Sequence, residues 1–195
     1  MRRHCAFILL IMFILASASP RRKELLGEIV SEFTVLPSGE EERAEGATPS
    51  DVVLSLARQK AESVARAHPE ATVLGADTVV VKDGKILGKP KSEEEAFSML
   101  SSLAGKVHSV FTGVCLIAGG KRFASFAETK VILAPLSERE IRAYVATGSP
   151  MDKAGAYGIQ DEGIVSSYQG SYTNVVGLPI ELVKDLLKQA EVKYE

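Results

Sequence analysis

Hydrophobic and polar residues along the chain follow two periods, and the first change of period comes near the N-terminus. An apolar run over residues 6–15 is typical of a buried strand and leads into Ala-Ser-Ala-Ser-Pro at 16–20. Ser19 can cap a helix with Pro20 at its first position. Three apolar residues then recur at helical spacing: Leu25, Leu26 and Ile29. The pattern predicts a strand, a tight turn and a helix.

The next segments predict a second helix and a second strand. Thr48 can cap a helix whose apolar residues recur at helical spacing as far as residue 68. Residues 72–81 are rich in Val and predict a buried strand, interrupted by Gly-Ala-Asp-Thr at 75–78. A turn at 83–84 should lead to a short partner strand, because Asp-Gly favours tight hairpins.

Two later helices are predicted from capping boxes, in which a Ser is followed three residues later by a Glu. The pairs are Ser92 with Glu95 and Ser137 with Glu140. Between these helices, residues 107–118 and 123–133 predict two long strands that form a hairpin at Gly119-Gly120.

The C-terminal part combines a glycine-rich loop with short elements. The loop covers residues 151–160, short strands are predicted at 164–168 and 172–176, and a last helix follows Pro179. Strands and helices alternate without a repeat or linker, which predicts an α/β fold with a mixed, twisted sheet and helices on its faces. We expect residues 12–195 to form one domain.

Charge and cysteine content narrow the classes of function. The 23 Lys and Arg residues nearly balance the 25 Asp and Glu residues, so the chain lacks the positive field that nucleic-acid binding needs. We therefore predict no nucleic-acid partner. Cys5 and Cys115 have no metal-ligand spacing and lie in apolar runs, which favours free thiols in a reducing compartment.

The N-terminus has two interpretations. Two arginines, the apolar run and Ala16-Ser17-Ala18 have the form of a secretory signal peptide. The run is too short to span a membrane, which takes about 20 residues. Cleavage after Ala18 would remove the first serine of the turn described next, so we favour a strand, a cytoplasmic location and no membrane partner. We expect the working chain to begin at Met12, with residues 1–11 an extension whose deletion leaves activity unchanged.

The first candidate site is the turn between the first strand and helix. Ser17, Ser19, Arg21 and Arg22 would place hydroxyls, backbone N–H groups and two guanidiniums at a helix N-terminus, which is an anion-binding arrangement. Taken alone, the same residues are also typical of an ordinary helix cap followed by solvent-exposed arginines.

Other candidates are single charged residues. Asp77 lies in an apolar strand and should pair with a cation, a metal or an N–H group, because an unpaired buried carboxylate is costly. An Asp that forms a turn after Gly-Ala is an equally ordinary structural interpretation. Lys60 on the second helix and Lys89 beside Pro90 could equally be solvent-exposed. An acidic loop containing Glu41 and Glu42 can be solvated or can supply metal ligands.

The hydrophobic pattern predicts that one histidine is buried. His108 lies between apolar neighbours in a predicted strand, where a structural histidine is more common than a catalytic one.

Taken together, several segments resemble the Maf family of nucleotide pyrophosphatases. They are Leu-Ala-Ser-Ala-Ser-Pro-Arg-Arg at 15–22, Gly-Ala-Asp-Thr-Val-Val at 75–80, Gly-Lys-Pro at 88–90, residues 105–112 with His108, Asp-Lys-Ala-Gly-Ala-Tyr-Gly-Ile-Gln at 152–160, and Gly-Ser-Tyr to Gly-Leu-Pro over 170–179. The resemblance runs from Met12 to the C-terminus. It implies a Maf/ITPase-like fold with two lobes around a central cleft, a divalent metal cation (Mg²⁺ or Mn²⁺) as cofactor, and a nucleotide as ligand.

The resemblance also implies roles for residues. Ser17, Arg21, Arg22, Lys60 and Lys89 would contact phosphates. Asp77 would be the proton acceptor or a metal ligand, with Glu41 or Glu42 nearby. Arg21, Thr78 and Gln160 match the specificity positions of the pyrimidine subgroup, and the Gln amide suits the O4 and N3–H edge of uracil or thymine.

The resemblance therefore predicts hydrolysis of dTTP and UTP to the monophosphate and pyrophosphate. Three alternatives stay open: a regulator of septum formation without turnover, a pyrophosphatase for 7-methyl-GTP or another modified purine, and a secreted protein. A homodimer is also left open by the sequence.

Overall fold

The protein is built on one long mixed sheet, and the computed structural model describes residues 12–194 of it. The strands are paired in the order β2-β1-β3-β5-β6-β7, with β4 paired to β3. Their bounds are β1 Phe13–Leu15, β2 Thr34–Val35, β3 Thr72–Lys82, β4 Lys85–Leu87, β5 Val107–Ala118, β6 Lys121–Leu133 and β7 Val165–Gln169. β1 is parallel to β2 and β3, and the remaining pairs are antiparallel. The predicted α/β fold with a mixed sheet is confirmed.

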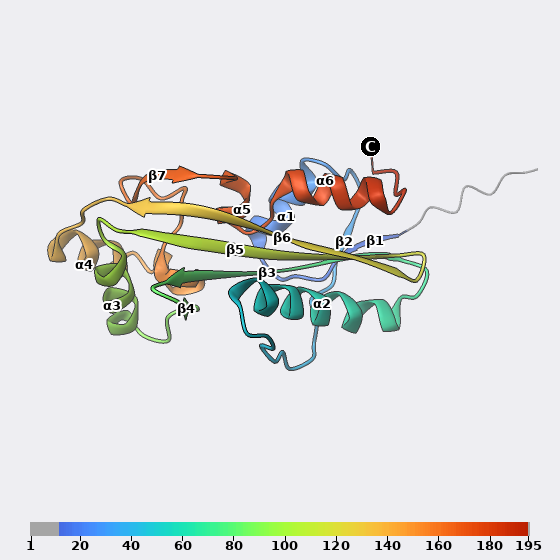
Figure 1. Cartoon of the computed structure of the whole chain (residues 1–195), viewed down its shortest axis with the longest axis horizontal. Helices are drawn as coiled ribbons and strands as arrows, with labels where there is room; N and C mark the ends of the chain where they lie inside the picture. The colour runs from blue at the N-terminus through green and yellow to red at the C-terminus, as the bar shows by residue number, and fades with distance from the viewer. Residues whose placement is uncertain (1–11, 195) are drawn as a thin grey trace, which may run out of the picture.

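Helices cover both faces and one end of the sheet (Figure 1). The α-helices are α1 Pro20–Gly27, α2 Pro49–Ala67, α3 Glu93–Leu103, α4 Glu138–Ala146, α5 Tyr172–Val176 and α6 Ile180–Gln189, and the 3₁₀ turns are η1 Ser149–Asp152 and η2 Ala154–Ala156. α2 lies below the sheet in Figure 1 and α1 and α6 lie above it, whereas α3 and α4 sit at the far end.

The first lobe is a three-layer packing around the N-terminal strands. Alternating side chains of β3 point to opposite faces: Leu74 packs with α1 and α6, and Val73 packs with α2. α2 lies very close to the sheet, since a Cβ on Gly75 would be 2.4 Å from the carbonyl oxygen of Ala57 and one on Gly113 would be 2.4 Å from that of Val53. Only glycine therefore fits at these two strand positions.

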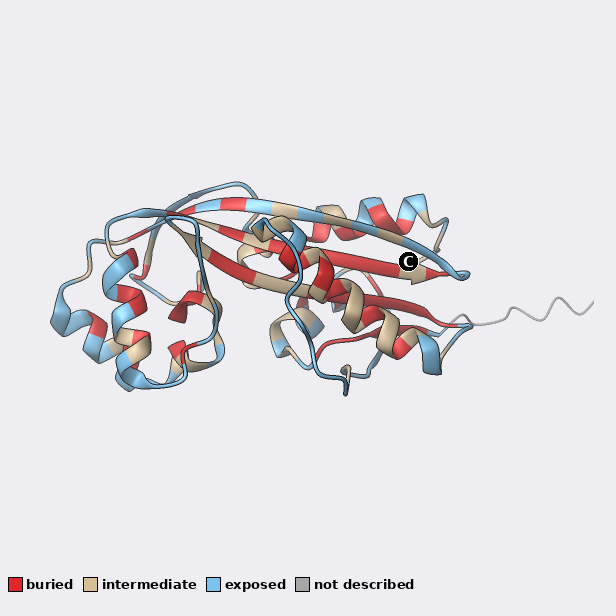
Figure 2. Ribbon diagram, turned by 60° about the horizontal axis from the view of Figure 1, so that its bottom comes forward, coloured by how far each residue is buried: buried red, intermediate tan, exposed pale blue. Residues whose placement is uncertain are grey.

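The second lobe is built around the far ends of β5 and β6. Its core joins α3 and α4 to η2 and includes Leu100, Leu103, Ile141 and Tyr157. In Figure 2 the buried residues of this lobe lie on the inner sides of its helices. The strands β3 and β5 are buried over much of their length, whereas β6 is mostly exposed or half-buried. The two lobes are thus two cores that share one sheet.

Three details of the predicted elements are wrong. β3 is continuous over 72–82, because Gly75 to Thr78 keep their ladder partners on β5. Residues 172–176 form the short helix α5 and not a strand: the Ser171 side chain accepts the N–H of Asn174 and caps it.

The third correction concerns the start of α3. Ser92 caps it as predicted, but the Glu95 carboxylate accepts from the N–H of Lys91, so the box is incomplete. The boxes at Thr48 and Ser137 are both complete.

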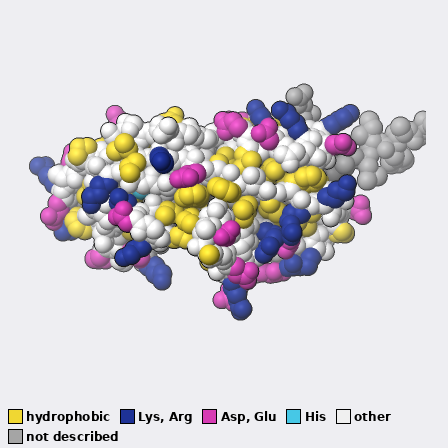
Figure 3. All heavy atoms as spheres, in the orientation of Figure 1, with side chains coloured by type: hydrophobic (Ala, Val, Ile, Leu, Met, Phe, Trp, Pro, Cys, Tyr) yellow, Lys and Arg dark blue, Asp and Glu magenta, His cyan; other side chains and the backbone are white. Residues whose placement is uncertain are grey.

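Charges of both signs are interspersed on the face shown in Figure 3, and hydrophobic side chains gather toward its middle. Within residues 12–194, no helix is long and apolar enough to cross a membrane. The predictions made for residues 1–11, including Cys5 and the start at Met12, lie outside the described residues.

Candidate active site

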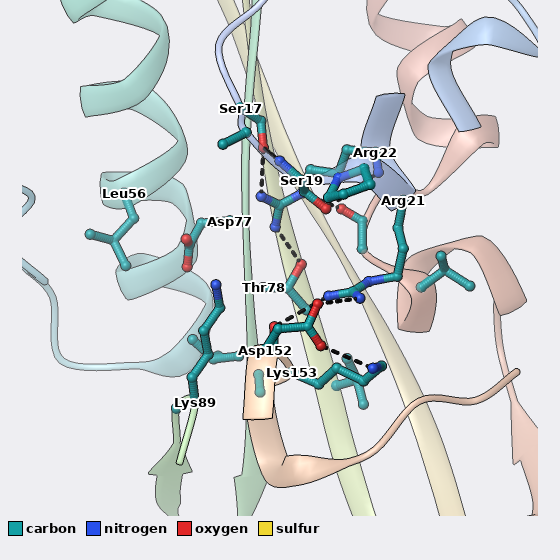
Figure 4. Close-up of a pocket in the computed structure, with 18 of the residues that line it drawn as sticks. Ser17, Ser19, Arg21, Arg22, Leu56, Asp77, Thr78, Lys89, Asp152 and Lys153 are labelled. Atoms are coloured by element: carbon teal, nitrogen blue, oxygen red, sulfur yellow. Dashed lines mark hydrogen bonds and ion pairs between the residues drawn. The ribbon is translucent and has the colours of Figure 1, made fainter. Parts of the chain in front are cut away.

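A cavity of about 710 Å³ lies between the two lobes, and Figure 4 shows the side chains that point into it. Its wall from the first lobe consists of the turn at 16–22, one face of α2 and the middle of β3. Its wall from the second lobe consists of residues 88–89 and the loop from 152 to 160, and residues 175–177 close one side. Ser17, Arg21, Arg22, Glu42, Lys60, Asp77, Thr78, Lys89 and Gln160 all line it.

The turn before α1 is held in shape by Arg22. Its guanidinium donates to the carbonyl of Gly177 at 2.8 Å, to the Ser17 hydroxyl at 3.1 Å and to the Thr78 hydroxyl at 3.0 Å. Burial lowers the pKa of Arg22, although the nearby Asp77 carboxylate opposes this. Arg22 therefore ties the turn, β3 and the segment after α5 into one unit.

Arg21 makes a contact between the lobes. It donates to the Asp152 carboxylate at 2.8 Å and to the Asp152 carbonyl at 3.2 Å, across 131 residues of sequence. The other carboxylate oxygen of Asp152 accepts from the ammonium of Lys153 at 2.9 Å (Figure 4). Partial burial would raise the pKa of Asp152, but these two hydrogen-bonded cations outweigh it and hold that pKa below its usual value.

Lys60 is not the solvent-exposed residue that its local sequence also allowed. Its side chain is only 14% exposed, and its ammonium lies 2.5 Å from a carboxylate oxygen of Asp77 and 3.2 Å from one of Glu42. The close packing of α2 on Gly75 and Gly113 brings Lys60 to Asp77. Of the three partners expected for Asp77, a cation, a metal or an N–H group, the structure shows a cation.

Only one of the two acidic loop candidates reaches the cavity. Glu42 lines it, whereas the Glu41 side chain is 85% exposed and lies 3.9 Å from Arg43. The position of Glu41 therefore gives no support to its expected role as a metal ligand.

Lys89 and Gln160 line the cavity from the second lobe. Within residues 12–194 their side chains make no hydrogen bond or ion pair with the protein. Lys89 points into the cavity in Figure 4. Both side chains are therefore available to a ligand.

Thr78 belongs to a chain of hydroxyl groups behind the cavity wall. It accepts from Arg22 and shares a hydrogen bond of 3.0 Å with Thr112, which donates to the backbone carbonyl of Asn174 at 3.0 Å. The chain joins β3 and β5 to α5, so Thr78 has a structural partner on each side as well as a place in the cavity wall.

His108 has the structural setting that its sequence context favoured. It is 4% exposed, and its Nε2 lies 2.7 Å from the hydroxyl of Tyr157. Tyr157 in turn lines the cavity. Burial lowers the pKa of His108 to about 4, so the ring is neutral at pH 7.

A family model described as Maf-like protein matches residues 12–190. The chain belongs to the Maf family. A relative named dTTP/UTP pyrophosphatase from Thermococcus kodakarensis is 51% identical over 175 residues, which cover 88% of this chain and 93% of the relative. A protein of the same name from Bacillus cytotoxicus is 50% identical over 91% of this chain and 94% of its own length.

The fold also has a solved neighbour. The Ham1 protein of Staphylococcus aureus aligns over 91% of this chain and 98% of its own length, with a TM-score of 0.55 and 15% identity. At that identity the match concerns the fold alone, and it confirms the predicted architecture of two lobes around a cleft.

Sequence reasoning did not single out three residues of this Maf-family cavity: Asp152, Lys153 and Tyr157. They lie within the glycine-rich segment at 151–160. The sequence signal that could have pointed to Asp152 and Lys153 is an acidic residue next to a basic one within a glycine-rich loop. The pairing of Asp152 with Arg21 could not be found from the local pattern, because the two residues are 131 positions apart in sequence.

Proposed function

We propose that this protein hydrolyses dTTP and UTP to the nucleoside monophosphate and pyrophosphate. The observation that carries the proposal is a cavity that brings the Asp77 carboxylate together with cationic side chains from both lobes: Arg21, Arg22, Lys60, Lys89 and Lys153. A nucleoside triphosphate carries about four negative charges at neutral pH, and stabilising them is the main task of phosphoryl-transfer sites. The names of relatives about half identical to this chain support the same activity.

In the proposed reaction, a water attacks the α-phosphorus and the bond to the bridging α,β-oxygen breaks, so that pyrophosphate leaves. Asp77 takes the proton of the water. Arg21, Lys60 and Lys89 neutralise the phosphates and the Ser17 hydroxyl donates a hydrogen bond to one of them, while Arg22 holds the turn that carries Ser17. Lys60 already lies against Asp77, so a phosphate that binds Lys60 also comes close to the proton acceptor.

The cavity offers two carboxylates, those of Asp77 and Glu42, to a divalent cation such as Mg²⁺. Within residues 12–194, no group of three or more His, Cys, Asp or Glu side chains is placed to hold a metal. Asp77 and Glu42, however, both converge on the one ammonium of Lys60, and Mg²⁺ commonly uses one or two carboxylates together with substrate phosphates. Asp77 and Glu42 are thus the residues that would hold Mg²⁺ or Mn²⁺, which when bound would supply Lewis-acid stabilisation of the phosphate charge.

Gln160 is proposed to read the base. Its amide offers one acceptor and two donors in a plane, which complement the N3–H and O4 of uracil and thymine. Its side chain lines the cavity and makes no hydrogen bond to residues 12–194. We propose that this activity takes place in the cytoplasm, where nucleotides are the available substrates.

The test is pyrophosphate release from a panel of nucleoside triphosphates with Mg²⁺ or Mn²⁺, including CTP, GTP and 7-methyl-GTP, with and without a chelator. We expect release from dTTP and UTP that stops in the presence of the chelator. Nucleotide binding without release would contradict the enzyme and favour a regulator, and a preference for 7-methyl-GTP would contradict the substrate. Release that persists unchanged with the chelator would contradict the metal requirement.

A further inference from the structure

Gln160 is carried by a tight turn whose ends lie close together. The N–H of Asp161 donates to the carbonyl of Gly158 at 3.2 Å, so Gln160 projects from a short loop closed by one hydrogen bond. Gly158 and Gln160 line the cavity, whereas Tyr144 and Asp161 do not. The side chain of Gln160 makes no hydrogen bond to the described part of the protein, so its position depends on this turn.

The hydroxyl of Tyr144 joins both ends of the turn. It donates to the Asp161 carboxylate and accepts from the N–H of Gly158 at 3.1 Å. The ring is carried by α4, whose neighbouring residues Ile141 and Val145 are buried in the core of the second lobe. Burial, together with the Asp161 hydrogen bond, raises the pKa of Tyr144, so the hydroxyl keeps the proton that it donates.

A further donor supports the same carboxylate and is itself held by a lysine. The Ser149 hydroxyl donates to Asp161 at 3.0 Å, and the ammonium of Lys153 donates to the Ser149 hydroxyl at 3.0 Å. The turn is also tightly packed, since a Cβ on Gly158 would lie 2.8 Å from an oxygen of Asp161 and 3.0 Å from Cε of Lys153. The conformation of the turn is therefore fixed by Tyr144, Ser149 and Asp161, which do not line the cavity, together with Lys153, which does.

We propose that Tyr144 and Asp161 are positioning residues that set base selectivity by holding the Gln160 turn. The inference rests on the proposed function, because it assigns to the turn the reading of uracil or thymine. Paired hydrogen bonds to a base require placement within a few tenths of an ångström, which an unsupported loop does not provide. Loss of the Tyr144 hydroxyl should weaken reading of the base and leave the phosphate end of the cavity unchanged.

The test compares Tyr144→Phe with Tyr168→Phe, which removes a tyrosine hydroxyl from an exposed residue of β7. For Tyr144→Phe we expect KM for UTP and dTTP to rise roughly tenfold, as for loss of a partly buried hydrogen bond, while kcat changes less than about threefold. KM for CTP should stay near its wild-type value, so the preference for UTP over CTP falls. Inhibition by inorganic tripolyphosphate, which has no base, should be unchanged, and Tyr168→Phe should match the wild type in every measurement.

The outcomes separate this inference from the proposed function. Absence of pyrophosphate release by the wild type would overturn the proposed function and the inference together. Wild-type release with an unchanged UTP to CTP preference in folded Tyr144→Phe would overturn the inference alone, as would an equal loss for all nucleotides together with weaker tripolyphosphate inhibition. If Tyr144→Phe does not fold, Ser149→Ala removes one donor to Asp161 and should lower the same preference by about threefold.

Discussion

The two ends of the cavity are built in different ways. At the end proposed to bind the phosphates, called the phosphate end, the charged groups come mainly from α1, α2, β3 and η1. Most are already paired with protein groups: Arg21 with Asp152, Arg22 with Ser17 and Thr78, and Lys60 with Asp77 and Glu42. At the other end, Gln160 faces the cavity without a partner of its own in the described chain, and the turn that carries it is bonded from behind.

The difference has a physical cause. Buried charges are costly without partners, so the phosphate end needs internal ion pairs when no substrate is present. A neutral amide at the cavity surface carries no such cost, and its geometry can be fixed through its backbone. In the proposed binding mode, the substrate would therefore exchange ion-pair partners at the phosphate end and add hydrogen bonds at the base end.

Replacing Asp77 tests the phosphate end with the largest expected effect. Asp77→Asn keeps the volume but removes the proton acceptor and one partner of Lys60, so kcat should fall by about 10²- to 10⁴-fold. Pyrophosphate release at saturating dTTP measures it, with circular dichroism to establish folding. Asp185→Asn, which makes the same charge change on the exposed face of α6, is the control and should keep wild-type turnover.

Near wild-type turnover in a folded Asp77→Asn protein would show that Asp77 is not the proton acceptor.

The stability of the folded protein should depend on pH through His108, which lies behind the cavity wall at Tyr157. The folded-state pKa of His108 is lowered from 6.5 to about 4, so as pH falls the unfolded chain takes up a proton that the folded chain does not. The stability contributed by neutral His108 is complete above about pH 6.5 and is lost as the pH falls toward 4. The loss over that window should be on the order of 3 kcal/mol.

Urea unfolding at pH 7 and pH 5 measures this dependence, and His108→Gln supplies the comparison because Gln does not titrate. The variant should lose less stability than the wild type between the two pH values. An equal loss in both proteins would assign the pH dependence to other groups.

Replacing Gln160 tests the base end directly. Gln160→Ala should raise KM for dTTP and UTP by about 10- to 100-fold, as for loss of a base-reading contact, and leave the melting temperature unchanged because the side chain is exposed. Steady-state kinetics with pyrimidine and purine triphosphates check this. Equal losses for both classes would argue against base reading by Gln160.

Replacing Asp152 should have the smallest effect. It tests whether Arg21 and Lys153 leave Asp152 to contact the substrate phosphates. Asp152→Asn removes a negative charge that holds Arg21 and Lys153, so KM for UTP should fall by a few-fold. The change should shrink in high salt, because such a pair is partly solvent-exposed. A rise in KM would show instead that Asp152 orients Arg21 for the substrate.

Local sequence signals were sufficient where a few neighbouring residues decide the conformation. Ser19 before Pro20 and Thr48 before Pro49 predicted the starts of α1 and α2, and glycines at 119–120 predicted the β5–β6 hairpin. Local signals failed at 172–176, where β-branched residues favoured a strand. Buried contacts made by Asn174 with Val110 and Thr129 accompany the helix found there.

By itself, the sequence determined the order of most elements and, through the strings shared with the Maf family, the residues to examine. Only the tertiary structure decided their partners. Lys60 meets Asp77 because two glycines let α2 approach the sheet, and Arg21 meets Asp152 because the two lobes face each other across the cavity. Local patterns record hydrogen bonds and burial within one element, whereas pairing of charges across elements depends on packing, which no short segment contains.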